Sequence, residues 1–226
     1  MVEDARFQTA VVTARHGLHA IAERVLAGPQ WRTSGTIRLT VTSDGFATTR
    51  SPGPGIDRLA VRGGTLAREP GGPVLPLAGR LDDLAAALGV VPDPPVGVYP
   101  DTGLDAPDEL ALPPEGVEAV LQALILGDQA LRAFTAAVGA TDQEPVLWPE
   151  HFDFGLSLDE VNYGVSPGDA GHPLPYAYVG PWAARSGPFW NEPFGAARDL
   201  RELGDVSAVT EFLLAGRGRA EADPRA

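Results

Sequence analysis

The sequence predicts an α+β fold, an antiparallel β-sheet with helices packed on one face. Apolar residues recur at three- and four-residue intervals near the N-terminus and in the middle of the chain, a spacing typical of helices that bury one side. Short segments in which apolar and polar residues alternate follow each helical stretch in consecutive runs. Because such runs are not interrupted by helices, they favour an antiparallel sheet over an alternating α/β fold.

The first half is expected to contain a long helix, a small antiparallel meander and a second helix. The apolar stripe places the first helix at residues 5–27, and Gly28-Pro29 is expected to end it. Alternation predicts a strand within residues 36–42, and a Gly-Gly turn divides residues 56–69 into two further strands. A short helix is expected within residues 77–90.

After a Pro- and Gly-rich loop over residues 91–113, the second half follows a similar order. A helix is expected over residues 113–138, since prolines and a glutamate suit a first helical turn. The clearest alternation, in residues 147–158, predicts a strand, and further strands lead to a last helix near residues 206–214. We expect a single α+β domain over residues 1–216 and a disordered C-terminal tail over residues 217–226.

Composition excludes several classes of chemistry. The 226 residues include 17 basic and 30 acidic side chains, with a net charge of −13 and no cysteine, and every basic residue is an arginine. Thiolate and Schiff-base chemistry and a Walker-A lysine are therefore excluded. An acidic surface repels phosphate and anionic lipid, so we expect no nucleic-acid or membrane partner. With no long apolar run and no signal-peptide pattern at the N-terminus, a cytoplasmic location is expected.

One sequence pattern imitates a nucleophile elbow. Residues 164–168 read Gly-Val-Ser-Pro-Gly, which matches G-x-S-x-G. In that elbow the backbone N–H after the serine stabilises an oxyanion, but Pro167 has no N–H. We therefore interpret the segment as a turn.

Histidines on the first helix are candidate metal ligands. His16 and His19 are three residues apart, so their side chains lie on neighbouring turns. His19 flanks the apolar stripe, whereas His16 lies roughly opposite it and is expected to be exposed. His19 is therefore the better candidate ligand, and a partly packed structural histidine is the alternative.

Asp128 falls within the apolar stripe of the central helix. A buried carboxylate is costly unless it is paired, hydrogen-bonded or metal-bound. It is interpreted either as a structural salt bridge to an arginine, or as a ligand or general base with a shifted pKa.

His151 and Asp153 alternate with Phe152 and Phe154 in the predicted strand, so both would project from one face. At two positions apart they could converge on one ion or one water. Gly155 would leave room above the sheet for a ligand or a second backbone. A solvated polar face is the alternative interpretation.

Aromatic residues gather in the C-terminal third. Tyr176 and Tyr178 would share one strand face, and His172 lies in the loop before them. Aromatic rings with a polar tip often line pockets, so these three residues are candidates for a ligand pocket. Packing at the edge of the core is the alternative.

Several blocks of the sequence resemble a widespread family of uncharacterised actinobacterial proteins. They include WPEHFD, NYGVSPGD and PYAYVGPW in the second half and LGDQALRAF in the centre, and the resemblance spans roughly residues 10–195. It implies an actinobacterial cytosolic protein and transfers no catalytic residue. The chain is also distantly similar to another group of unknown function with a Trp-Phe-Asp strand. There Asp153 would match and His151 would not, so that similarity does not imply a shared metal site.

Three functional hypotheses follow. The leading one is a cytosolic protein that binds a small molecule and a divalent metal through His19, Asp128, His151 and Asp153. Imidazole and carboxylate ligands would suit a transition metal such as zinc or iron. The second is a metal-free acid–base enzyme in which His151 carries the proton and Asp153 or Asp128 orients it. The third is a non-catalytic interaction protein in which the polar cluster is structural.

Overall fold

The computed structural model describes residues 2–100, 102–104 and 106–225. The chain divides into two compact units, and the single domain over residues 1–216 stays a prediction. Unit 1 comprises Met1–Gln122 and Leu147–Phe152, and unit 2 comprises Ala123–Val146 and Asp153–Ala226. Both units combine helices with antiparallel strands, so the predicted α+β class is confirmed.

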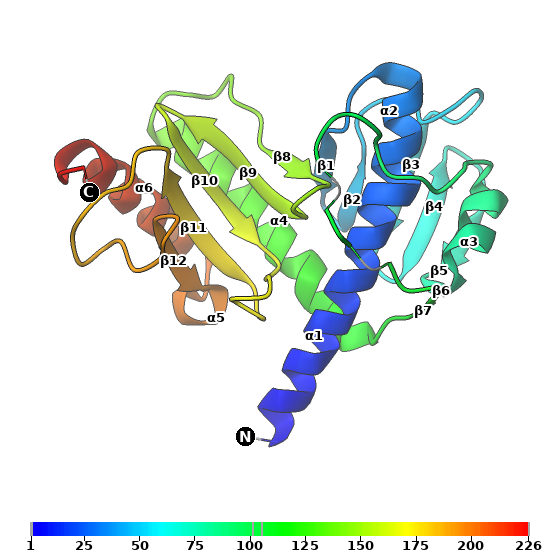
Figure 1. Ribbon diagram of the computed structural model, residues 1–226, viewed down its shortest axis with the longest axis horizontal. Coiled ribbons are helices and arrows are strands. Elements are labelled where there is room, and N and C mark those ends of the chain that lie inside the picture. Colours follow the sequence, from blue (N-terminus) through cyan, green and yellow to red (C-terminus); the bar gives the residue numbers. More distant parts are fainter. Residues whose placement is uncertain (1, 101, 105, 226) are drawn as a thin grey trace. The chain divides into compact units, whose positions relative to one another are not determined.

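Unit 1 begins with a long helix that packs on a meander of strands (Figure 1). Its elements are α1 (Val2–Ala20), η1 (Ile21–Ala27), α2 (Gly28–Ser34), β1 (Leu39–Thr42), β2 (Gly45–Thr48), β3 (Arg58–Arg62), β4 (Thr65–Glu69), β5 (Val74–Pro76), β6 (Ala78–Arg80), α3 (Leu81–Leu88), β7 (Glu109–Ala111) and the start of α4 (Pro114–Ala137). Strands β1 to β5 pair in sequence order, and the last two residues of β8 (Val146–Trp148) also belong to this unit, where Leu147 pairs with Leu39 of β1. The segment η1 contacts β1 and β2, which places the predicted apolar stripe in the core.

The first helix does not end at Gly28-Pro29, so that prediction is wrong. Between α1 and α2 the chain widens into the π-helical segment η1, in which the amide of Gly28 donates to the carbonyl of Glu23, five residues earlier. Proline lacks an N–H and crowds the carbonyl four residues before it. The wider turn, together with the position of Pro29 in the first turn of α2, lets the helix continue to Ser34.

A fully buried glutamine fixes α2 to the meander. The side-chain nitrogen of Gln30 donates to the carbonyls of Thr36 and Arg38, at 3.1 and 2.9 Å. Its oxygen accepts from the amides of Thr49 and Arg50, at 2.6 and 2.8 Å. A buried amide is stable only when its donors and acceptors are paired, and Gln30 meets this condition.

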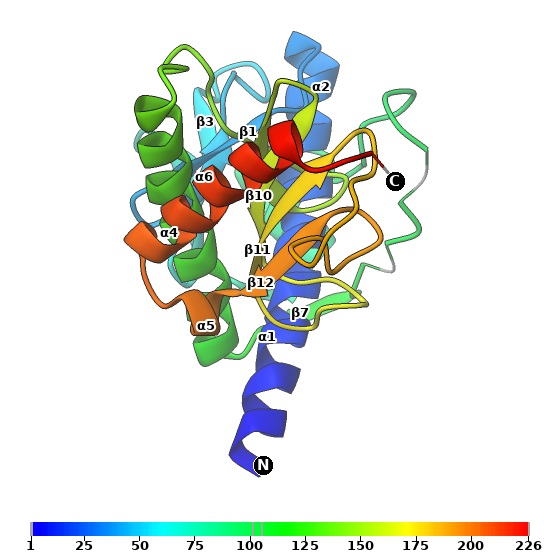
Figure 2. The same ribbon diagram turned by 90° about the vertical axis from the view of Figure 1, so that its left-hand side faces the viewer.

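Unit 2 is an antiparallel meander with helices on one face. It contains the rest of α4, β9 (Asp153–Leu158), β10 (Val161–Ser166), β11 (Tyr176–Pro181), β12 (Ala196–Asp199), α5 (Leu200–Leu203) and α6 (Val206–Ala222). The strands pair in the order β9, β10, β11, β12. Phe134 of α4 packs on Tyr163 of β10, with ring centroids 4.6 Å apart, and α6 contacts β10 and β11. Figures 1 and 2 show α4 and α6 on the same side of these strands.

The predicted strand over residues 147–158 is interrupted, and the prediction is wrong in its centre. β8 ends at Trp148 and β9 begins at Asp153. Between them the chain turns, the amide of Phe152 donates to the carbonyl of Trp148, and Phe152 has a positive φ of 51°. Pro149 cannot donate to a strand ladder, which favours a break at this point.

The last helix is longer than predicted. It starts at Val206, where the side chain of Asp205 accepts from the amide of Ala208, and continues to Ala222. Residues 217–222, expected to belong to a disordered tail, are helical. Arg217 pairs with Asp159 at 2.9 Å, which ties this end of the helix to the β9–β10 turn. Among the described helices, none is both long and apolar enough to cross a membrane.

Candidate functional site

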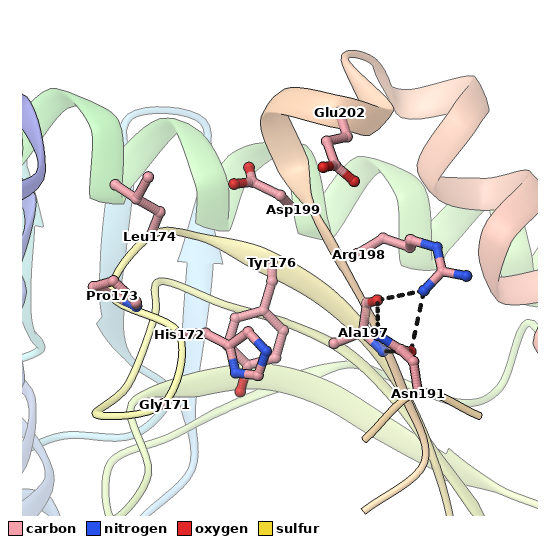
Figure 3. Close-up of a pocket in the computed structure, with 10 residues that line it drawn as sticks. All are labelled: Gly171, His172, Pro173, Leu174, Tyr176, Asn191, Ala197, Arg198, Asp199 and Glu202. Carbon is pink, nitrogen blue, oxygen red and sulfur yellow. Dashed lines mark hydrogen bonds between the residues drawn. The ribbon is translucent and has the colours of Figure 1, made fainter. Parts of the chain in front are cut away.

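A pocket with a volume of about 480 Å³ lies in unit 2 beside β11 and β12 (Figure 3). It is lined by Gly171, His172, Pro173, Leu174, Tyr176, Asn191, Ala197, Arg198, Asp199 and Glu202. His172 and Tyr176, two of the three residues expected to line a ligand pocket, are among them. Tyr178, the third, is not.

The loop before β11 is held by a single carboxylate. Asp169 accepts from the backbone amides of Gly171 and His172, both at 2.7 Å, and from the hydroxyl of Tyr176 at 2.6 Å. Burial alone would raise the pKa of Asp169, but these hydrogen bonds together lower it. Burial, followed by the bond to Asp169, raises the pKa of Tyr176 well above its ordinary value. Asp169 therefore stays ionised and Tyr176 stays neutral, and both hold the loop in place.

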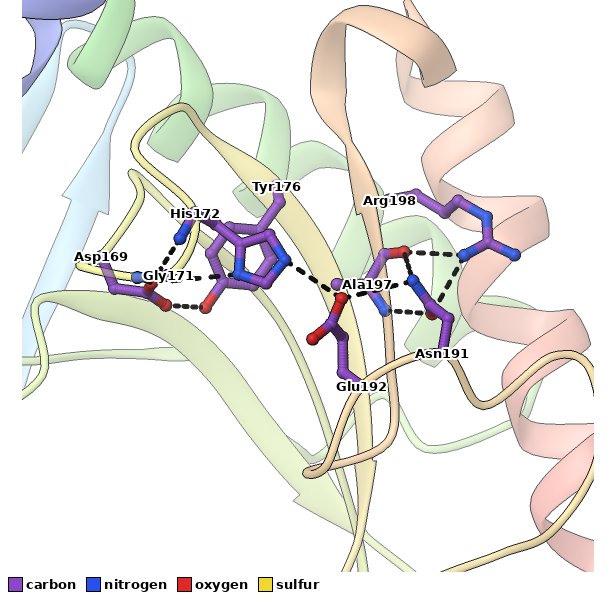
Figure 4. Close-up of polar contacts among 8 residues, drawn as sticks. All are labelled: Asp169, Gly171, His172, Tyr176, Asn191, Glu192, Ala197 and Arg198. Atoms are coloured by element: carbon purple, nitrogen blue, oxygen red, sulfur yellow. Dashed lines mark hydrogen bonds and ion pairs between the residues drawn. The ribbon is translucent and has the colours of Figure 1, made fainter.

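The imidazole of His172 lies between two carboxylates (Figure 4). Its Nε2 is 3.2 Å from Oε1 of Glu192, and its Nδ1 is 3.9 Å from Oδ1 of Asp169. The ring also packs on Tyr176, with centroids 4.7 Å apart. Since an ionised carboxylate can only accept, Nε2 is the nitrogen that donates to Glu192. The orientation of the ring is therefore set by its neighbours rather than by solvent.

Asn191 closes the outer edge of β12. Its amide nitrogen donates to the carbonyl of Ala197 at 3.3 Å, and its oxygen accepts from the amide of Ala197 at 3.1 Å. The side chain thus occupies the backbone groups that a further strand would use, a common way to block an exposed sheet edge. The same oxygen accepts from Nη1 of Arg198 at 3.1 Å.

Two carboxylates stand on the β12–α5 side of the pocket. Asp199 caps α5 by accepting from the amide of Arg201 at 2.8 Å. Glu202, from α5, is exposed, and its side chain forms no hydrogen bond or ion pair with any residue that the structure describes. Figure 3 shows both side chains next to the ribbon of β12 and α5.

The space expected above Gly155 is filled by the protein itself. Gly155 of β9 pairs with Gly164 of β10, which pairs with Tyr178 of β11. A Cβ atom on Gly164 would lie 2.5 Å from the ring and hydroxyl of Tyr178, so this ring lies directly over the two glycines. Its hydroxyl donates to Oδ2 of Asp153. Burial and then the charge of Asp153 raise the pKa of Tyr178 well above its ordinary value. The expectation of an open site at Gly155 is wrong.

His151 does not lie in a strand. It is an exposed residue of the turn between β8 and β9, so the predicted shared strand face with Asp153 is not formed. His151 belongs to unit 1 and Asp153 to unit 2. Pro149 was the sequence signal for this break, because proline cannot donate a hydrogen bond to a strand ladder and so argues against a continuous strand.

His19 is held in place by a hydrogen bond and by ring stacking. Its Nε2 is 2.7 Å from the carbonyl oxygen of Pro149, and its ring stacks on Phe152 with centroids 5.4 Å apart. Because a carbonyl only accepts, Nε2 carries the hydrogen and does not serve as a metal ligand in this geometry. Burial lowers the pKa of His19 to about 4, against the opposing hydrogen bond to Pro149. His16, in contrast, is exposed as expected.

Asp128 is paired within its own helix. Both of its oxygens accept from Nε of Arg132, at 2.9 and 3.0 Å, one turn further along α4. This is the structural salt bridge that the sequence left as one of two interpretations. The carboxylate is one-fifth exposed, at 21%.

The predicted metal ligands are thus found in separate environments, His19 and His151 in unit 1 and Asp128 and Asp153 in unit 2. Within the described ranges, no group of three or more His, Asp or Glu side chains is arranged to hold a metal ion. Metal binding by these four residues, and catalysis by His151 and Asp153, stay predictions.

Sequence reasoning did not identify six polar or charged residues of the pocket region: Asp169, Asn191, Glu192, Arg198, Asp199 and Glu202. The spacing of Asp169 from Gly171 and His172 was a usable signal, since aspartates often bond amides two and three residues ahead in turns. No local signal connects Glu192 with His172, which are 20 residues apart and meet through folding alone.

Comparison with known proteins gives no further identification. No family model, curated protein or solved structure matches the chain. The resemblance to an actinobacterial family therefore stays a prediction from the sequence blocks.

Proposed function

We propose that this protein binds a small molecule in the pocket beside His172 and Tyr176. The observation that carries the proposal is the imidazole of His172, which Glu192 and Asp169 flank at the wall of a cavity of about 480 Å³. Cavities of a few hundred cubic ångströms that combine apolar walls with a few oriented polar groups are the usual form of ligand sites.

The order of the pocket supports this proposal. Asp169 fixes the loop that carries His172, and Asn191 fixes the backbone of Ala197, another residue of the lining. Polar groups that are already oriented lose little freedom when a ligand binds, which favours affinity. Leu174 and Pro173 add an apolar surface next to these groups.

A fragment screen tests the proposal. Proton–nitrogen correlation spectra of the labelled protein would be recorded with small carboxylates, amines, sugars, nucleosides and phosphate esters. We expect at least one fragment to shift the amide signals of Gly171, His172 and Ala197 together, because all three line the pocket.

A matched pair of variants localises the binding. His172→Ala should weaken the fragment at least several-fold, whereas His16→Ala, which removes an exposed imidazole from unit 1, should leave the affinity unchanged. If no fragment shifts the pocket amides, or if both variants behave alike, the proposal is wrong.

A further inference from the structure

We infer that the pocket takes a small organic cation with N–H donors, such as a primary amine or a guanidine. The inference rests on the proposed function and adds the chemical class of the ligand. It follows from the charges around the cavity, from the contacts that hold the one arginine in its lining, and from the carboxylate acceptors and apolar side chains of that lining.

Carboxylates dominate the surroundings of the pocket. Asp199 and Glu202 line it directly, and Asp169 and Glu192 flank the imidazole of His172. The lining holds two carboxylates and one arginine, within a protein of net charge −13, and an excess of one sign of charge concentrates ions of the opposite sign. This field favours a cation over an anion.

Arg198 is the lining residue that could take an anion instead, but its guanidinium is already held. Nη1 donates to the side chain of Asn191 and to the carbonyl of Ala197, at 3.1 and 2.8 Å. The guanidinium also lies over the rings of Phe189 and Phe212, with Cζ 6.0 and 5.8 Å from the two centroids. These contacts hold Arg198 on the helix side of β12, and no described ion pair joins it to Asp199 or Glu202.

The carboxylate oxygens of the pocket can accept further hydrogen bonds, which favours a ligand with N–H donors. Glu202 has no partner among the described residues, and Asp199 retains acceptor capacity beyond its bonds to Arg201. Carboxylates bind ammonium and guanidinium groups through charge-assisted hydrogen bonds, which are stronger than neutral ones. Leu174 and the ring of Tyr176 provide apolar walls for the carbon chain of such a ligand.

A series of four-carbon compounds tests the inference. Putrescine carries two ammonium groups, aminobutanol one and butanediol none, while succinate carries two carboxylates. We expect the affinity at the pocket amides to fall in the order putrescine, aminobutanol, butanediol, with succinate not binding. Added sodium chloride should weaken putrescine, because these charges are partly exposed.

Charge-removing variants give the matched control. Glu202→Gln should weaken putrescine about two- to fivefold, the range for a partly exposed ion pair. Asp199→Asn, which can still cap α5, should weaken it similarly. Glu144→Gln removes the same charge from an exposed position of unit 2 that does not line the pocket, and should change nothing.

The outcomes separate the two proposals. If succinate or butanediol binds as well as putrescine, or if Glu202→Gln and Glu144→Gln have equal effects, the cation class is wrong and the proposed function stands. If none of the four compounds binds while a fragment of another class does, the cation class is also wrong and the proposed function also stands. If no fragment of any class shifts the pocket amides, both proposals fail.

Discussion

His19 makes the stability of unit 1 depend on pH. Burial lowers its pKa from 6.5 to about 4, with smaller contributions from the charges of His16, Arg15 and His151. Between these two values the unfolded chain binds a proton that the folded protein does not. Stability from His19 is therefore complete above pH 6.5 and is lost as the pH falls from 6.5 to about 4.

The size of the effect follows from the pKa difference. Each pKa unit corresponds to about 1.4 kcal/mol, so the change from 6.5 to about 4 is worth roughly 3 kcal/mol. His19 is not fully buried, and solvent screening reduces this to about 2 kcal/mol. At pH 4.5 most of this stability should be lost.

Two measurements check the prediction. Imidazole proton signals in an NMR titration should show His19 titrating near pH 4. Urea denaturation of the protein and of His19→Phe should then differ in pH dependence. The phenylalanine keeps a ring against Phe152 but cannot titrate, so its free energy of unfolding should fall about 2 kcal/mol less between pH 7 and 4.5.

Titration of His19 near pH 6.5, or equal pH slopes for the protein and His19→Phe, would refute the argument. Either result would mean that His19 is hydrated in solution and that its Nε2 does not donate to the carbonyl of Pro149.

Two further predictions concern stability. Gln30→Leu keeps the volume but removes the partner of the carbonyl of Thr36 and of the amides of Thr49 and Arg50, and one of two partners of the carbonyl of Arg38, which should cost about 3 kcal/mol by urea denaturation. A loss below about 1 kcal/mol would show that water replaces the amide. Gly164→Ala should displace the ring of Tyr178 and cost about 2–3 kcal/mol, whereas Gly64→Ala, where a Cβ meets open space, should be close to neutral. Equal thermal shifts for the two alanine variants would contradict the packing of Tyr178 on the glycines.

The sequence correctly predicted the helices and strands that are specified by neighbouring residues, through periodicity and turn residues. The long helix α4, the hairpin between β3 and β4 with its Gly63-Gly64 turn, and the helix α3 closed at Gly89 all lie where periodicity and turn residues indicated. Local propensity failed where non-local contacts compete with it. The first helix continues through Pro29 because a π-helical turn accommodates the proline, and the end of α6 buries Ala220 and pairs Arg217 with Asp159.

The sequence by itself determined which chemistries were available: imidazoles, carboxylates and tyrosines, with no thiol and no lysine. It also identified His172 and Tyr176 as candidates for a pocket. Only the tertiary structure decided which partners these groups have. Glu192 reaches His172 across 20 residues, Tyr178 covers Gly155, which had suggested an open site, and Arg132 pairs with Asp128. The physical reason is that a polar side chain is defined by what it bonds and how far it is buried, and both depend on residues that only the folded chain brings together.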